Sequence, residues 1–132
     1  MKHTEILTRL EENLSRAYSP YSTVKVAAAV VYEDGGEEKI SYGVNVENVS
    51  YGLTLCAERN AVGDAVVNGM KSIKAVYLMS NQSDPVLPCG ACRQVVTEFM
   101  HDADAPVFSS NVSQSKTWQS TLGELLPNRF DL

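Results

Sequence analysis

The sequence lacks a long apolar run, and it lacks an excess of positive charge. No apolar segment approaches the roughly 20 residues that a membrane-spanning helix needs, and the N-terminal residues 1–10 are too polar for a signal peptide. Eleven basic side chains against 16 acidic ones leave a net charge of −5, with no basic stripe to grip a phosphate backbone. We therefore expect a cytoplasmic protein that binds neither membranes nor nucleic acid and acts on a small free molecule.

Cysteine is also scarce, with three residues in the chain. An odd number of cysteines in a reducing compartment argues against a disulfide framework and leaves buried thiols or metal ligands. The length of 132 residues allows one domain, residues 1–132, with a modest core. Apolar residues make up 44% and charged residues 20%, which is typical of a globular protein.

Helical and strand patterns alternate along the chain. Helices are expected at residues 4–18, 56–67 and 89–101, with a helical turn at 122–126. Strands are expected at residues 24–32, 40–46, 73–80 and 105–110, with a weaker one at 116–120. A Gly-Gly turn joins the first two strands as an antiparallel hairpin, whereas strands joined through helices predict parallel pairing further on. The pattern predicts an α/β fold with three layers, α/β/α, around a mixed five-stranded sheet.

Two cysteine-containing segments carry the candidate chemistry. Cys56 stands at the start of the second expected helix, and Cys89 and Cys92 stand at the start of the third. Three thiolates that converge on one ion leave a fourth tetrahedral position open, which is the arrangement of a catalytic rather than a structural zinc site. Backbone N–H groups and the helix dipole at both helix starts favour ionised thiolates. The sequence therefore predicts Zn²⁺ held by these three residues.

Glu58 and Arg59 follow the first cysteine closely. Glu58 is expected to lie beside the open coordination position, where it would take a proton from zinc-bound water and deliver it to a ring nitrogen and then to the departing amine. Three thiolates and one zinc ion carry a net negative charge, so Arg59 is expected to hydrogen-bond the sulfurs. The alternative for Arg59 is a solvated surface side chain. Cys-x-Glu followed by Pro-Cys-x-x-Cys is the three-cysteine form of the zinc deaminase signature.

Other interpretations of the cysteines explain less of the pattern. A redox Cys-x-x-Cys pair gives no role to Cys56 or Glu58, and three buried apolar thiols give none to the acid. A zinc-stabilised binding module without catalysis accounts for the thiols but not for the open position. Editing of a base within a polynucleotide uses the same signature, and the acidic balance of the chain argues against it.

Several stretches resemble the small cytidine deaminases: residues 43–61, residues 88–94, Ser19-Pro20-Tyr21-Ser22 and the tail at 124–130. The resemblance covers nearly the whole chain. It implies a zinc-dependent enzyme that hydrolyses cytidine and 2′-deoxycytidine to uridine and 2′-deoxyuridine, releases ammonia and serves pyrimidine salvage. It also implies a homotetramer whose sites are shared between subunits.

The resemblance further implies a set of substrate-binding residues. Asn45 and Glu47 would bind the ribose hydroxyl, which fits two polar side chains on the same side of a strand. Tyr51 would line the same pocket, and backbone groups near Ala57 would bind the polar edge of the base. Phe130 would stack on the pyrimidine in a neighbouring subunit, the alternative being packing on its own chain.

The sequence departs from the family where Val24 replaces an aromatic residue and Ala27 replaces a glycine. Valine offers no ring face for stacking on the base. Blasticidin S deaminases also lack that aromatic residue, so another cytosine nucleoside such as blasticidin S is the alternative substrate.

Overall fold

The structure is a computed structural model that describes residues 2–132. Its helices are α1 (Lys2–Leu14), α2 (Ala57–Val67), α3 (Gly90–Thr97) and α4 (Leu122–Leu125), with a 3₁₀ turn at Tyr51–Leu53. Its strands are β1 (Val26–Asp34), β2 (Glu37–Val44), β3 (Ser72–Ser80), β4 (Pro106–Asn111) and β5 (Thr117–Thr121). Among residues 2–132, no helix has the length and apolar character needed to cross a membrane.

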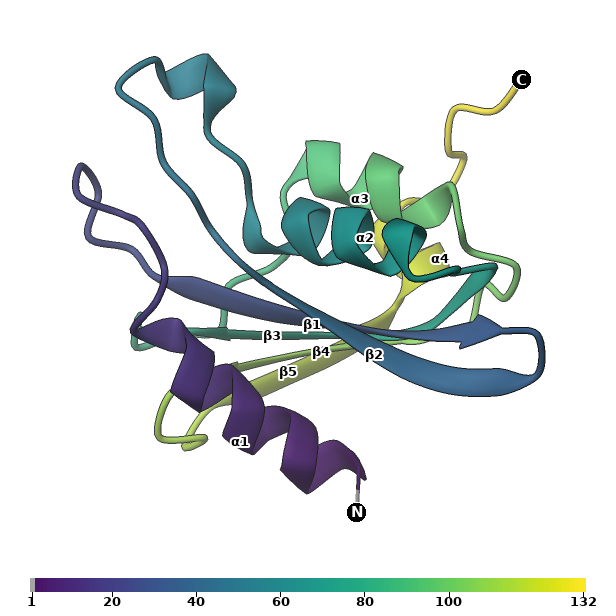
Figure 1. Cartoon of the computed structure of the whole chain (residues 1–132), viewed down its shortest axis with the longest axis horizontal. Helices are drawn as coiled ribbons and strands as arrows, with labels where there is room; N and C mark the ends of the chain where they lie inside the picture. Colours follow the sequence, from purple (N-terminus) through teal and green to yellow (C-terminus); the bar gives the residue numbers. More distant parts are fainter. Residues whose placement is uncertain (1) are drawn as a thin grey trace.

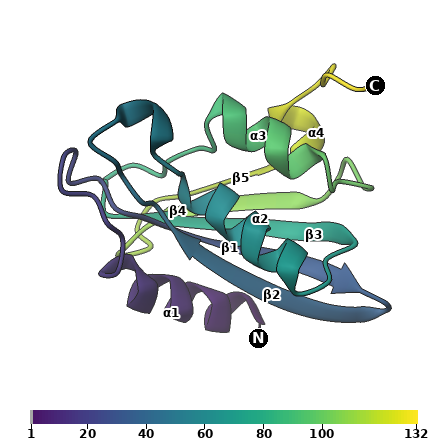
Figure 2. The same cartoon turned by 45° about the horizontal axis from the view of Figure 1, so that its top comes forward.

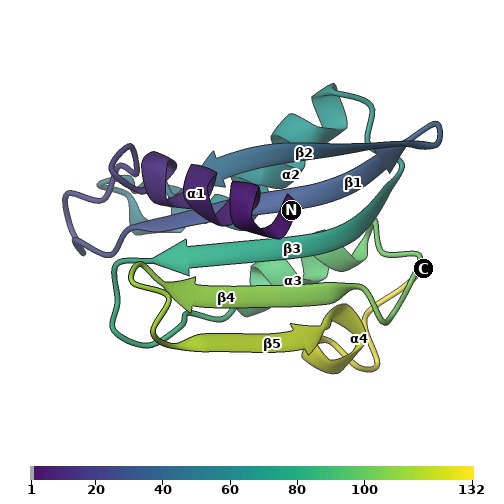
Figure 3. The same ribbon diagram turned by 90° about the horizontal axis from the view of Figure 1, so that it is seen from below.

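The strands form one mixed sheet in the order β2-β1-β3-β4-β5. β1 is antiparallel to both β2 and β3, β3 and β4 are parallel, and β5 is antiparallel to β4. Helix α1 covers one face of the sheet, and α2, α3 and α4 lie on the other (Figures 1 and 3). The three-layer α/β/α arrangement with a mixed five-stranded sheet is therefore confirmed.

The central strand β1 explains how the helices approach both faces. Its residues from Ala27 to Tyr32 are all buried, because side chains from alternate positions enter the cores on the two sides. Ala28, Val30 and Tyr32 join the core beneath α2 and α3, whereas Ala27 and Ala29 join the core beneath α1. The run of alanines leaves room for helices to pack closely on this strand.

Several predicted boundaries were wrong by a few residues. Helix α1 ends at Leu14 rather than residue 18, and α3 ends at Thr97 rather than residue 101. After α3 the backbone continues with hydrogen bonds from residue i to residue i−3, which tighten the last turn into 3₁₀ geometry. Strand β2 begins at Glu37, because polar residues at the tip of a hairpin can extend its ladder without any apolar pattern.

One glycine sets the distance between β2 and α2. A Cβ atom on Gly43 would lie 2.5 Å from both the Ala57 carbonyl oxygen and the Ala61 amide nitrogen. Only a residue without a side chain permits this approach, which seats the first turn of α2 directly on the sheet. The segment between β2 and α2 projects beyond the sheet at the same end of the molecule as the loop after α1 (Figures 1 and 2).

Candidate active site

The three cysteines meet where α2 and α3 begin on the same face of the sheet. Cys56 is the N-cap of α2, Cys89 is the N-cap of α3, and Cys92 lies in the first turn of α3. The sulfur atoms of all three lie within 4.8 Å of one another, and those of Cys56 and Cys89 are 3.8 Å apart. The backbone N–H of Cys92 donates to the Cys89 sulfur at 3.5 Å. The expectation that distant helix starts bring these sulfurs together is confirmed.

This donor set fits zinc. Zinc–sulfur bonds of about 2.3 Å at tetrahedral angles place sulfur atoms about 3.8 Å apart, which matches the observed Cys56–Cys89 separation. Within residues 2–132, these cysteines are the one group of three or more histidine, cysteine or acidic residues arranged to hold a metal ion. His3 lies elsewhere, with its Nδ1 atom 3.2 Å from the Tyr77 hydroxyl. No protein side chain therefore completes the set as a fourth ligand among the described residues.

The surroundings of the sulfurs favour a thiolate at Cys56. Hydrogen bonding from the Cys92 thiol, reinforced by Arg59 and Cys89, lowers the pKa of Cys56 to about 5. The shared proton correspondingly raises the pKa of Cys92. Arg59 Nη2 donates to the Cys56 sulfur at 3.6 Å and to the Thr54 carbonyl oxygen at 3.2 Å. Its Nε is buried without a hydrogen-bond partner in the described chain. Arg59 therefore faces the sulfurs instead of lying free on the surface.

Glu58 lies in the first turn of α2 and is only 5% exposed. Burial raises the pKa of its carboxyl to about 7, and the charge on Cys56 adds to the increase. A carboxyl whose pKa is near neutrality can both accept and donate a proton at physiological pH. This environment suits an acid–base group far better than a surface ion pair.

A cavity of about 160 Å³ opens beside these groups. Cys56, Glu58 and Cys89 line it together with Asn45 and Ala57. Its remaining wall is formed by residues that sequence reasoning missed: Val26, Thr54, Leu55, Val86 and Leu87. A cavity of about 150 Å³ is known to hold one benzene ring, so this one matches a single six-membered ring.

Asn45 and Glu47 both hold the loop that precedes β1. The Asn45 amide accepts from the Val26 N–H at 2.9 Å and donates to the Val24 carbonyl oxygen at 2.8 Å. Since an amide offers two N–H groups and two lone pairs, Asn45 keeps one of each for a ligand. The Glu47 carboxylate accepts from the N–H groups of Tyr21 and Ser22 and from the Ser22 hydroxyl, and these bonds lower its pKa.

Glu47 and Tyr51 line a second, larger cavity of about 440 Å³, which shares Thr54 with the first. Tyr51 is 75% exposed and packs edge-on against Tyr21.

Val24 lies in the loop before β1, and it is Val26, two residues later, that lines the smaller cavity. Phe130 is 72% exposed near the C-terminus and lies outside both cavities. Side chains two residues apart in an extended chain point to the same side, so Val26 points to the same side as Val24. This alternation is the one sequence signal that could have indicated Val26 as a cavity residue.

A triad of thiols with an acid buried beside them, on one wall of a ring-sized cavity, defines a zinc-dependent hydrolytic site on an α/β/α fold. Comparison with known proteins agrees. The model of the cytidine and deoxycytidylate deaminase zinc-binding region matches residues 1–107. The chain belongs to this family, and zinc is the cofactor that its three cysteines fit.

Several relatives match along most of their length. A cytidine deaminase of Sporosarcina psychrophila is 39% identical over 126 residues, covering 96% of this chain and 89% of that protein. One from Halalkalibacterium halodurans is 43% identical over 114 residues, covering 86% and 83%. The crystal structure of cytidine deaminase from Burkholderia pseudomallei superposes with a TM-score of 0.85 at 36% identity, covering 98% of this chain and all of that one.

Proposed function

We propose that residues 1–132 form one deaminase domain that hydrolyses cytidine and 2′-deoxycytidine to uridine and 2′-deoxyuridine with release of ammonia. The observation that carries this proposal is the position of Glu58, a buried acid on the wall of the same cavity as Cys56 and Cys89. Relatives that match most of this chain are named cytidine deaminases, which supports the choice of substrate. We place the reaction in pyrimidine salvage in the cytoplasm.

Each residue has a defined task in this reaction. Cys56, Cys89 and Cys92 hold the zinc ion, and Arg59 offsets their charge at the Cys56 sulfur. A zinc ion in such a site lowers the pKa of a water molecule, which makes hydroxide available near neutral pH. Glu58 would accept one proton of the attacking water and donate it to the ring nitrogen, and it would then accept the remaining proton of the added hydroxyl group and pass it to the departing amine. Its pKa of about 7 allows both directions of transfer at physiological pH.

Substrate binding follows from the two adjoining cavities. The smaller one takes the pyrimidine ring, with the backbone at Ala57 facing its polar edge and Val26 on the wall. Asn45 and Glu47 bind the ribose hydroxyl, since Asn45 lines the smaller cavity and Glu47 the larger. Val24 acts indirectly, because its carbonyl oxygen holds the Asn45 amide.

We also propose a homotetramer with sites shared between subunits. Apolar side chains are unusually exposed at the end of the molecule near the cavities, where Val49, Tyr51 and Leu53 are 77%, 75% and 68% exposed. Exposed large apolar side chains gathered in one loop favour an interface with another subunit. Phe130, exposed and near the chain end, is free to stack in the site of a neighbour. Sedimentation of the purified protein tests the assembly, and a stable monomer with full activity would contradict it.

Loss of cytidine absorbance on zinc-loaded protein tests the reaction. Wild type should turn over cytidine and 2′-deoxycytidine, and Glu58→Gln should keep its zinc but lose turnover by about two to four orders of magnitude. Free cytosine should be a poor substrate, because it offers nothing to Asn45 and Glu47. Blasticidin S serves as the rival substrate, and preferential turnover of it would replace cytidine in this proposal. A Glu58→Gln protein with near-normal activity would remove the assigned role of the acid.

A further inference from the structure

The loop between β3 and α3 contributes residues to the site although it has no regular secondary structure. It carries Val86 and Leu87 on the cavity wall and ends at Cys89. Within the described chain, residues 2–132, no backbone–backbone hydrogen bond involves residues 82–88. A segment of this kind depends on side chains for its position, because free backbone groups alone leave many conformations open.

Side chains from β4 provide the buried anchors. The Ser109 hydroxyl, which is fully buried, donates to the Val86 carbonyl oxygen. Asn111, the last residue of β4 and 7% exposed, donates from Nδ2 to the Ser83 carbonyl oxygen at 3.0 Å. Because β3 and β4 are parallel and Ser80 pairs with Asn111, the end of β4 lies where the loop leaves β3.

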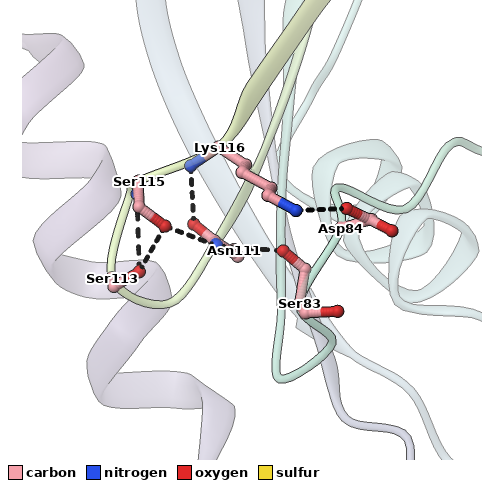
Figure 4. A network of polar contacts seen from close by, with 6 residues as sticks. All are labelled: Ser83, Asp84, Asn111, Ser113, Ser115 and Lys116. Carbon is pink, nitrogen blue, oxygen red and sulfur yellow. Dashed lines mark hydrogen bonds and ion pairs between the residues drawn. The ribbon is translucent and has the colours of Figure 1, made fainter.

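The Asn111 amide uses both of its N–H groups and one lone pair of its oxygen. Its Nδ2 also donates to the Ser115 hydroxyl at 2.9 Å, and its Oδ1 accepts from the Lys116 N–H at 3.2 Å (Figure 4). The side chain thus connects the β4–β5 hairpin to the loop, with both amide hydrogens and the carbonyl satisfied. The nearby Lys116–Asp84 ion pair also joins the β4–β5 hairpin to the loop. Its side chains are 60% and 78% exposed, and such exposed pairs contribute little to stability.

We propose that Asn111, assisted by Ser109, is a positioning residue that fixes the loop carrying Val86, Leu87 and Cys89 in the geometry needed for zinc retention and ring binding. The inference rests on the proposed use of the three sulfurs as zinc ligands. Pro85 and Pro88 restrict the intervening backbone, and the Nε of Arg93 donates to the Pro88 carbonyl oxygen at 2.7 Å, so the loop is held at both ends: by Asn111 and Ser109 from β4 and by Arg93 next to Cys89. Nothing in the sequence of this serine-rich hairpin distinguishes Asn111 from an ordinary turn residue.

The variant Asn111→Asp tests the proposal at nearly constant volume. It places a carboxylate oxygen against the Ser83 carbonyl oxygen with no hydrogen between them, while keeping an acceptor for Lys116. Ser109→Ala removes the second anchor from a buried position and is close in size to the original side chain. Ser113→Ala is the matched control, since it removes the two hydrogen bonds between Ser113 and Ser115 within the hairpin and none to the loop.

Zinc loss into excess chelator, followed with a zinc indicator and without substrate, is the primary measurement. Asn111→Asp and Ser109→Ala should each release zinc about tenfold faster than wild type, whereas Ser113→Ala should not. With activity normalised to bound zinc, the first two should also show a raised KM, because Val86 and Leu87 line the ring cavity. Zinc release at the wild-type rate in Ser109→Ala and Asn111→Asp, or equal acceleration in Ser113→Ala, would overturn the proposal.

Two further outcomes are separable. If Asn111→Asp does not fold, Ser109→Ala decides the question on the same measurement. If wild type binds zinc through the cysteines but deaminates nothing, the proposed function fails while the zinc-release comparison still reports on the loop.

Discussion

Glu58 should destabilise the metal-free protein at neutral pH. Burial raises its pKa from 4.5 in the unfolded chain to about 7 in the fold. Between these values the folded protein keeps a proton that the unfolded chain has released, so the free energy of unfolding falls as pH rises. With about 1.4 kcal/mol for each pH unit, the loss reaches about 3 kcal/mol by pH 8. Replacing Glu58 by Gln removes this titration.

The measurement is urea unfolding of chelator-treated wild type and Glu58→Gln, followed by circular dichroism at one protein concentration and under reducing conditions. The variant should gain about 3 kcal/mol over wild type between pH 4.5 and about pH 8. Cys56 acts with the opposite sign: its pKa is lowered to about 5, so its contribution to stability grows with rising pH up to its unfolded value of 9.0. Because Cys56 is present in both proteins, its own titration largely cancels, and the difference between them reports the titration of Glu58 together with its repulsion by the Cys56 thiolate. A difference that stays flat over this range, or that favours wild type at high pH, would refute the reasoning.

Three other changes have definite expected outcomes. Gly43→Ala should lower the free energy of unfolding by about 1–3 kcal/mol in urea titrations, because its Cβ meets backbone atoms of α2 at 2.5 Å, whereas Gly63→Ala, with open space around it, should be neutral or stabilising. Arg59→Gln should raise the pKa of Cys56, so iodoacetamide should alkylate metal-free protein more slowly at about pH 6; an unchanged rate would show that Arg59 does not act on the thiolate. Removing zinc with a chelator should abolish cytidine turnover and adding zinc should restore it, and activity that persists without metal would exclude a catalytic role for zinc.

The centre of the site could be predicted because helix starts obey simple rules. Cys56 and Cys89 each precede a helical pattern, and two helices on the same face of a sheet bring their first turns together. Glu58 follows from its spacing after Cys56. The sheet could be predicted for a similar reason, since buried strands separated by helices leave few arrangements.

The part of the cavity wall formed by Val86 and Leu87 could not be predicted, because these residues belong to a loop with no periodic pattern. The anchor of that loop could not be predicted either. Asn111 reaches the loop because β4 pairs in parallel with β3, which places Asn111 beside Ser80, and the residues around Asn111 in the sequence do not indicate this pairing. Val24, the position where the family has an aromatic residue, lies in the loop before β1, and Val26 lines the smaller cavity. Such details depend on where a strand begins, which is the least certain part of a sequence-based prediction.

The hydrogen bonds of Asn45 and Glu47 have a consequence for enzyme redesign. These two side chains hold the loop before β1 even without a ligand. Replacing either of them to accept a different sugar would therefore also change the conformation of this loop. Changes of sugar preference introduced at these positions should therefore bring losses in expression and solubility. Val86 and Leu87 contact the same cavity with apolar side chains, and they offer a safer starting point for libraries aimed at modified pyrimidines.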